Sequence, residues 1–208
     1  MERYMLILKS YKRMPLEIEE ILRNNVFQIS VSKHQIIQTP DVLNDNLYFI
    51  EKGLVHLFIL VNGRKESLGF RKEDQFIVTL KSACGDPGDD GSGIEALEDL
   101  VLWCFPGRFV EDLKKKFHQF SIQYLAILSK EMLAFRHASI CSDPTGGDSN
   151  YEHLLRHFPE LVDRVPVNYL ASFLQIPEKV ILHLKSSKMK LLVSTTRRYR
   201  RGNKPKGY

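Results

Sequence analysis

Residues 117–139 read FHQFSIQYLAILSKEMLAFRHAS, and this stretch decides how the rest of the chain is organised. Its apolar side chains recur at spacings of three, four and three, which is the pattern of a helix that buries one seam. The residues of this seam are Leu125, Leu128, Met132 and Phe135. The core helix of a single globular domain has the same spacing. Here, however, a β pattern precedes the stretch and a compact helical pattern follows it, so we predict a long helix that connects two modules.

The composition is that of a folded protein. With 208 residues, of which 43% are hydrophobic and 10% aromatic, the chain can build packed cores. The apolar run at residues 4–8 is too short for a secretory signal, and no later run approaches the length of a membrane span. We therefore expect a soluble cytoplasmic protein without a membrane partner. Cys84, Cys104 and Cys141 form no CxxC pair and cannot supply a four-thiolate site, so free thiols are expected.

Charge is distributed unevenly along the chain. The net charge is +5, but residues 179–208 carry ten Lys and Arg and no acid, which leaves 20 basic against 25 acidic residues in 1–178. A basic end on an acidic body indicates a nucleic-acid partner at the C-terminus. A solvated basic tail would have the same composition, so charge alone does not decide between the two.

Between residues 26 and 105 the apolar pattern has a period of two. Turn residues separate short β-branched or aromatic runs, and Asn62-Gly63 is a strong hairpin signal because both residues tolerate a positive φ. Strands at this spacing, with no helices between them, predict an antiparallel sandwich or barrel. The predicted strands are residues 26–29, 34–38, 47–50, 54–61, 64–70, 75–80, 94–97 and 101–105.

The remaining segments of this half are predicted from their Pro and Gly residues. Pro15 and Pro106 each open a short helix, since proline is tolerated in a first helical turn. Residues 81–93 are rich in Gly and Asp and match neither a phosphate-binding glycine motif nor an EF-hand, so we predict a loop. Residues 142–150 form a second break in composition and are predicted to be a hinge.

Residues 166–186 read PVNYLASFLQIPEKVILHLKS and have the pattern of a helix-turn-helix. Ala171 allows two crossed helices to approach closely, and Pro166 and Pro177 lie near the two helix starts. Such a unit places its second helix in the major groove of DNA. The alternative is a pair of core helices of any α domain. The turn needs a left-handed backbone, which costs about 1 kcal/mol at Gln175.

The outward face of the second helix is unusual for a reading helix. Arg, Asn, Gln or Glu commonly contact base edges, whereas this face offers Lys179, Leu182, His183 and Ser186. Lys179 and His183 are the candidates for base contacts. Leu182 fits a thymine methyl, but it also fits a surface that no longer reads sequence. The lysines and arginines that follow suit phosphates; the candidates are Lys185, Lys188, Lys190, Arg197 and Arg198.

The order of these elements resembles the Crp/Fnr family of bacterial transcription regulators over about residues 10–187. Residues 47–60 look like the family's paired strands around a turn Gly, residues 94–105 (IEALEDLVLWCF) are similar to its late strands, and residues 169–184 to its reading head. The resemblance implies an α+β fold with an N-terminal antiparallel β-roll or jelly roll. It also implies a homodimer through the seam of the long helix and a C-terminal winged helix-turn-helix on a palindromic operator.

The implied domain boundaries follow from the same resemblance. They are 1–116 for the cyclic-nucleotide-binding-like β-roll, 117–141 for the dimerisation helix, 142–150 for the hinge, 151–190 for the DNA-binding domain and 191–208 for a basic, partly disordered tail.

The stretch equivalent to the family's phosphate cassette departs from the family pattern. Members that bind cyclic nucleotide have a Gly-Glu pair followed by an Arg. Residues 80–94 contain neither, and their aspartates would repel a phosphate. We therefore predict no cofactor and no cyclic-nucleotide binding by the usual chemistry. Arg71, the nearest arginine upstream, is the one candidate for ligand binding.

Nothing in the sequence indicates catalysis or a metal. There is no discernible Ser-His-Asp or Cys-His arrangement, and His34, His56 and His118 are scattered. The leading prediction is a homodimeric regulator of double-stranded DNA, whose β module senses an unidentified small molecule or serves as a dimer scaffold. Two alternatives stay open: an interaction protein of the same fold that has lost sequence-specific DNA binding, and a small-molecule sensor with no gene target.

Overall fold

The computed structural model describes residues 2–39, 45–78, 92–143, 146 and 148–186. The chain divides into two compact units, Met1–Ile140 and Cys141–Tyr208, which are described separately below. The first unit combines antiparallel sheets with helices and the second is helical where it is described, so the predicted α+β class is confirmed. No helix of the described part is long and apolar enough to cross a lipid bilayer.

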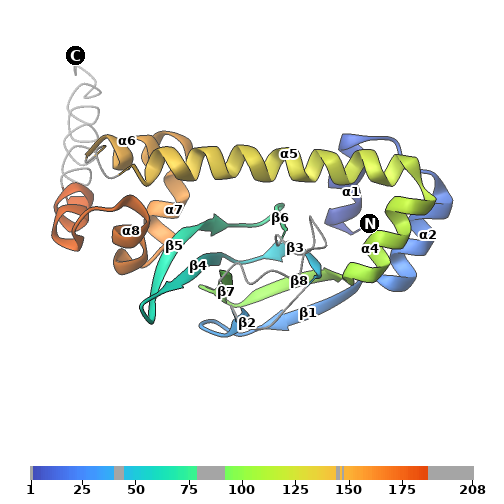
Figure 1. Cartoon of the computed structure of the whole chain (residues 1–208), viewed down its shortest axis with the longest axis horizontal. Coiled ribbons are helices and arrows are strands. Elements are labelled where there is room, and N and C mark those ends of the chain that lie inside the picture. The colour runs from blue at the N-terminus through green and yellow to red at the C-terminus, as the bar shows by residue number, and fades with distance from the viewer. Residues whose placement is uncertain (1, 40–44, 79–91, 144–145, 147, 187–208) are drawn as a thin grey trace, which may run out of the picture. The chain divides into compact units, whose positions relative to one another are not determined.

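Two four-stranded antiparallel sheets form the β-roll of the first unit (Figure 1). Their strand orders are β1-β8-β3-β6 and β2-β7-β4-β5. Strands far apart in sequence pair within each sheet, as β1 does with β8. The strands are β1 (Phe27–Val31), β2 (Ile36–Gln38), β3 (Leu47–Lys52), β4 (Val55–Val61), β5 (Arg64–Arg71), β6 (Phe76–Ile77), β7 (Ser92–Ala96) and β8 (Leu100–Phe105).

The turn signals in the sequence correspond to turns in the structure. Asn62 and Gly63 both have positive φ, 51° and 76°, and join β4 to β5 as the hairpin signal predicted. Gly53, with φ 98°, lies between β3 and β4, where a Cβ would approach the Asp99 carbonyl oxygen to 2.8 Å. The strand predicted at 75–80 is limited to Phe76–Ile77 in the described residues.

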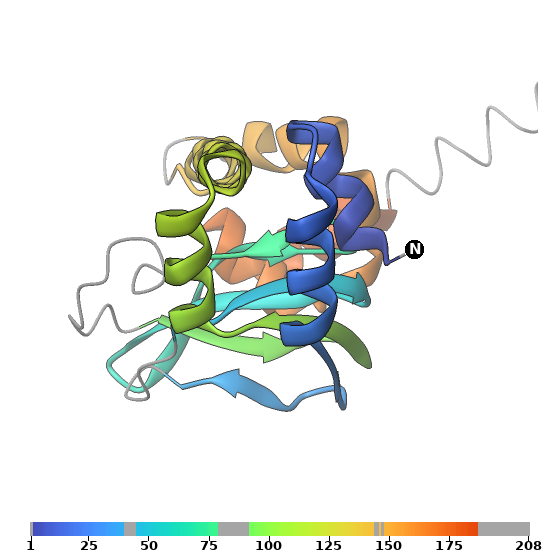
Figure 2. The same ribbon diagram turned by 90° about the vertical axis from the view of Figure 1, so that its right-hand side faces the viewer.

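Helices cover one side of the roll (Figures 1 and 2). Prolines precede two of them, as predicted: Pro15 is the N-cap of α2 (Leu16–Asn25) and Pro106 that of α4 (Gly107–Lys116). The helix α1 (Arg3–Tyr11) was not predicted, since the apolar run at residues 4–8 indicated from sequence only that a signal peptide is absent. Tyr4, Met5 and Leu8 of that run are buried in the core that α1 shares with the roll, whereas Leu6 is 53% exposed.

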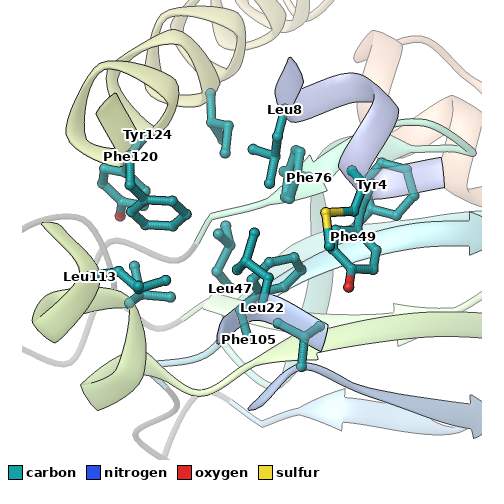
Figure 3. Packing of buried hydrophobic residues seen from close by; sticks show 14 of the residues in the cluster. Tyr4, Leu8, Leu22, Leu47, Phe49, Phe76, Phe105, Leu113, Phe120 and Tyr124 are labelled. Carbon is teal, nitrogen blue, oxygen red and sulfur yellow. The ribbon is translucent and has the colours of Figure 1, made fainter. Parts of the chain in front are cut away.

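An aromatic core lies between these helices and the first sheet (Figure 3). The ring of Tyr4 on α1 lies 5.1 Å from that of Trp103 and 5.2 Å from that of Phe105, in tilted and edge-on arrangements that suit aromatic quadrupoles. Phe120 and Tyr124 enter the same core from α5 (His118–Cys141). Leu47, Phe49 and Phe105 complete it from the sheet.

The helix predicted at 117–139 is α5, and it has two apolar faces where the sequence analysis expected one. The face that packs into the core carries Phe120, Tyr124 and Ile127, each no more than 3% exposed. Of the predicted seam, Leu128 packs against the same core, whereas Met132 and Phe135 are 74% and 66% exposed in the single chain. These two residues of the predicted seam are therefore not buried within one chain, and the dimer stays a prediction.

The described part of the second unit contains α6 (Asp148–His157), α7 (Pro159–Arg164), α8 (Val167–Leu174) and a helix that begins at residue 178 and is described to 186. Gln175 has φ 54° and ψ 36°, the left-handed turn conformation expected between the last two helices. The side chain of Asn150 donates to the Leu174 carbonyl at 3.2 Å, which satisfies one carbonyl at the end of α8. Because α6 begins at Asp148, the last three residues of the predicted hinge are helical.

Two cysteines are described, and both are free and buried, as expected for structural thiols. Burial raises the pKa of Cys104 and of Cys141 to about 11, which keeps both thiols protonated and unreactive at neutral pH.

Candidate functional site

A cavity of about 590 Å³ lies in the first unit between the β-roll and the second half of α5. Its walls are almost entirely apolar. The roll contributes Leu57, Leu68 and Ile94, and α5 contributes Leu128, Met132 and Phe135. A volume of this size is typical of a site for a small organic molecule.

A β-bulge shapes the wall that β5 contributes. Leu57 pairs with Gly69 but Phe58 pairs with Ser67, so Leu68 is the extra residue on β5. A bulge of this kind re-aims a side chain that strict alternation would place on the other face. Leu68 lines the cavity as a result.

Arg71, the last residue of β5, brings a permanent positive charge into this wall. Its side chain is 9% exposed and forms a two-pronged pair with Glu131 of α5. Nη2 donates to Oε2 at 2.8 Å, and Nε lies 3.0 and 3.2 Å from the two carboxylate oxygens. Nη1 donates to the Phe70 carbonyl at 2.9 Å, which fixes the guanidinium in place. The pair therefore joins the β-roll to the long helix at the cavity.

A buried polar cluster lies on the opposite face of β4 from Leu57. Nε2 of His56 and Oγ of Ser67 are 2.8 Å apart, and Nδ1 of His56 is 3.7 Å from Glu95. Lys65 pairs with Glu95 at 2.7 Å. Burial lowers the pKa of His56 to about 4, and the Glu95 carboxylate opposes that shift without cancelling it. His56 is therefore neutral at physiological pH.

The histidines considered as metal ligands do not come together. His56 belongs to the buried cluster, whereas His34 and His118 are exposed, the former with a left-handed φ of 68°. Among the residues that the structure describes, no group of three or more His, Cys, Asp or Glu is arranged to hold a metal ion.

The helix at 178–186 presents the face that its periodicity predicted. Lys179, Leu182, His183 and Ser186 are exposed, Lys185 is half-buried, and Ile181 is fully buried. Ser186 Oγ donates to the His183 carbonyl at 2.7 Å. The other predicted phosphate contacts lie outside the described residues: Lys188, Lys190, Arg197 and Arg198.

The predicted dimer residues have two different positions in the structure. Leu125, Met132 and Phe135 are more than half exposed, whereas Leu128 is half-buried. Three of the four, Leu128, Met132 and Phe135, also line the cavity, which the sequence analysis did not foresee. The missed signal was Glu131, an acid three residues after Leu128 and four before Phe135, and therefore on their face of the helix.

No family model matches the sequence, and a search of curated proteins finds no similar sequence. Solved structures do match. A Crp/Fnr-family protein from Eubacterium rectale superposes with a TM-score of 0.65 at 16% identity, covering 85% of each chain. FixK2 from Bradyrhizobium japonicum gives 0.64 at 15% identity, covering 80% of this chain and 85% of FixK2.

The chain has the Crp/Fnr fold. The c-di-GMP-responsive global regulator CLP of Xanthomonas campestris supports the same conclusion, with a TM-score of 0.60 at 16% identity over 85% of this chain and 93% of CLP. The fold expected from the resemblance in sequence is therefore confirmed, although the identities are too low to transfer any ligand or operator. Within this fold, the described part of the chain has a cavity beside α5 and an exposed face on the helix at 178–186.

Proposed function

We propose that the protein is a cytoplasmic transcription regulator that binds double-stranded DNA as a homodimer, with the β-roll as its sensor. The observation that carries the proposal is the helix at 178–186. It follows a left-handed turn at Gln175 and exposes Lys179 and His183 on one face, in a chain with the Crp/Fnr fold. The second helix of such a unit enters the major groove.

The residues divide into base contacts and phosphate contacts. Lys179 and His183 suit base edges, and the exposed Leu182 suits a thymine methyl. Lys185 and the basic residues that follow it suit the phosphate backbone, where each neutralised phosphate releases counterions and makes affinity salt-dependent.

The proposed dimer forms through the exposed apolar face of α5. Leu125, Met132, Leu133 and Phe135 are each more than half exposed in the single chain. Large exposed apolar residues along one helix are typical of an interface. A second copy of α5 would remove this surface from water and set the distance between two reading helices.

Binding to random duplex DNA across a salt titration tests the proposal. We expect measurable affinity at low salt that falls steeply as salt rises. His183→Ala should relax selectivity at one base position, whereas Lys188→Ala should weaken all sequences about equally and reduce the salt slope by about one. Lys115→Ala, which removes an exposed cation on α4, is the matched control and should change neither property.

A second candidate is an interaction protein that keeps the fold without reading DNA. The 54% exposure of Leu182 at the centre of the helix favours it, since an apolar residue there also suits a protein partner. A complete lack of affinity for duplex DNA at low salt would support this candidate and exclude the regulator.

A further inference from the structure

We propose that the cavity binds a small organic anion with an apolar body, and that the ligand's carboxylate replaces Glu131 on Arg71. The inference rests on the proposed regulator, because it specifies what the sensor recognises. Three features of the cavity carry it: the chemistry of its described walls, the geometry of the Arg71 guanidinium and the absence of other described contacts to the Glu131 carboxylate that now pairs with it.

The walls select the body of the ligand. Leu57, Leu68 and Ile94 on one side and Leu128, Met132 and Phe135 on the other have no polar side-chain groups. Among the described residues that line the cavity, Arg71 and Glu131 are the two ionisable ones and Ser92 has the one hydroxyl. A ligand rich in hydroxyls or ring nitrogens would bury polar groups here without partners, which is unfavourable.

Arg71 selects the head group. A guanidinium is always charged, and its planar fork matches the two oxygens of a carboxylate. Glu131 already occupies this fork: Nε and Nη2 both donate to Oε2, at 3.0 and 2.8 Å, and Nε also lies 3.2 Å from Oε1. The pair therefore shows the chemistry that the site recognises, with a carboxylate of the chain itself standing in for that of a ligand.

Glu131 is able to leave without disturbing the site. Its side chain is long and 19% exposed, and the described contacts of its carboxylate are those to Arg71. Arg71 stays in position after the exchange, because Nη1 remains bound to the Phe70 carbonyl. A ligand carboxylate thus pairs with a guanidinium that is already held in position, while the Glu131 carboxylate becomes hydrated.

The exchange gives the ligand an effect beyond the cavity. Arg71 ends β5 and Glu131 lies on α5, so their pair is a bond between the roll and the helix. A ligand that takes Arg71 breaks this bond and places its own body against Leu128, Met132 and Phe135. Met132 and Phe135 also belong to the proposed dimer face. Binding of a ligand in the cavity is therefore coupled to dimerisation through that face.

Calorimetric titration of the full chain tests the proposal with three carboxylates: octanoate, dodecanoate and 4-phenylbutyrate. The primary amide of each, which has the same body without the charge, is the matched probe. We expect at least one acid to bind at least tenfold tighter than its amide. Equal affinity for acid and amide, or no binding of any acid, would overturn the proposal, as would tighter binding of 3′,5′-cyclic AMP than of every acid.

Two substitutions identify the residues involved. Glu131→Gln removes the internal competitor, so the acids should bind about two- to fivefold tighter while affinity for the amides is unchanged. Arg71→Gln should abolish the preference for acids and keep the binding of amides. Lys65→Gln removes a cation that pairs with Glu95 away from the cavity and should leave the preference intact. If Arg71→Gln does not fold, the result with Glu131→Gln decides alone, and an unchanged acid affinity there contradicts the exchange.

Duplex binding by the same samples separates this inference from the proposed function. Loss of DNA binding together with an intact acid preference would exclude the regulator but keep the ligand site. DNA binding without any preference for acids would keep the regulator but exclude the proposed ligand site.

Discussion

The two halves of α5 pack against the same β-roll in opposite ways. In the first half, Phe120 and Tyr124 fill the space between the helix and the sheet (Figure 3), and Ile127 belongs to the same core; each of the three is no more than 3% exposed. In the second half, Met132 and Phe135 border a cavity of about 590 Å³ and remain mostly exposed. One helix thus has a filled half and a hollow half.

The bonds that attach each half to the unit differ in the same way. Gln123 in the filled half donates to the backbone carbonyls of Leu8 and Lys12, at 3.1 and 2.9 Å. These hydrogen bonds between uncharged groups join α1 to α5. The hollow half is attached by the ion pair of Arg71 and Glu131, whose carboxylate another anion can imitate. The filled half therefore stabilises the unit. The hollow half retains a cavity and the proposed exchangeable ion pair of Arg71 and Glu131, and the unfilled cavity lowers stability.

The largest effect is expected from emptying the filled half. Phe120→Ala removes a ring that is 1% exposed and should lower the free energy of unfolding by about 3 to 5 kcal/mol, measured by urea denaturation. Phe135→Ala is the matched change in the hollow half and should cost less than about 1 kcal/mol. Both are made in a Met132→Glu chain, so that dimerisation does not contribute. Equal losses from the two substitutions would mean that the halves do not differ.

The next effect concerns the surface that the hollow half leaves uncovered. Met132→Glu places a charge in the proposed dimer face, where its burial would be costly, and should weaken dimerisation at least about 100-fold. Analytical ultracentrifugation at micromolar concentration measures this as conversion from dimer to monomer. Gln119→Glu adds the same charge at an exposed position in the first half of α5 and should change nothing. A wild-type chain that is already monomeric at these concentrations would exclude the proposed dimer.

Sequence reasoning predicted the elements whose signals are local and missed those that depend on distant residues. Asn62-Gly63 and Gln175 lie in the turns expected of them, because a positive φ is a property of a few adjacent residues. The helix α1 and the second apolar face of α5 are apolar only because they pack together, and neither segment alone indicates its partner. A period of 3.6 predicted the outward face at 178–186, but no pattern connects two residues that lie 60 apart, as Arg71 and Glu131 do.

A smaller effect is expected from His56, which lies on β4 in the sheet that lines the cavity. Because the pKa of His56 is about 4 in the folded chain and about 6.5 when unfolded, the unfolded chain binds the proton first as pH falls. Stability should therefore fall between pH 6.5 and 4, with His56 contributing about 2.5 kcal/mol of the loss.

The measurement is the free energy of unfolding in urea across this range. His56→Gln should be less stable at pH 7 but should lose less stability on acidification than the wild type. His34→Gln, at an exposed position, should follow the wild type. Parallel curves for His56→Gln and the wild type would show that His56 does not titrate differently in the two states.

The smallest effect distinguishes the ion pair of Arg71 and Glu131 from the uncharged hydrogen bonds of Gln123 along α5. A double-mutant cycle with Arg71→Gln and Glu131→Gln should give a coupling of about 0.5 to 1 kcal/mol, because the carboxylate is partly exposed and its attraction to Arg71 is screened. Raising the salt from about 0.05 to about 0.5 M should reduce this coupling further, since the screening length shortens. Gln123→Leu removes the neutral bonds to Leu8 and Lys12, so its cost should be the same at both salt concentrations. If the coupling of Arg71 to Glu131 is equally insensitive to salt, the pair is a fixed part of the core, and the hollow half has no exchangeable contact.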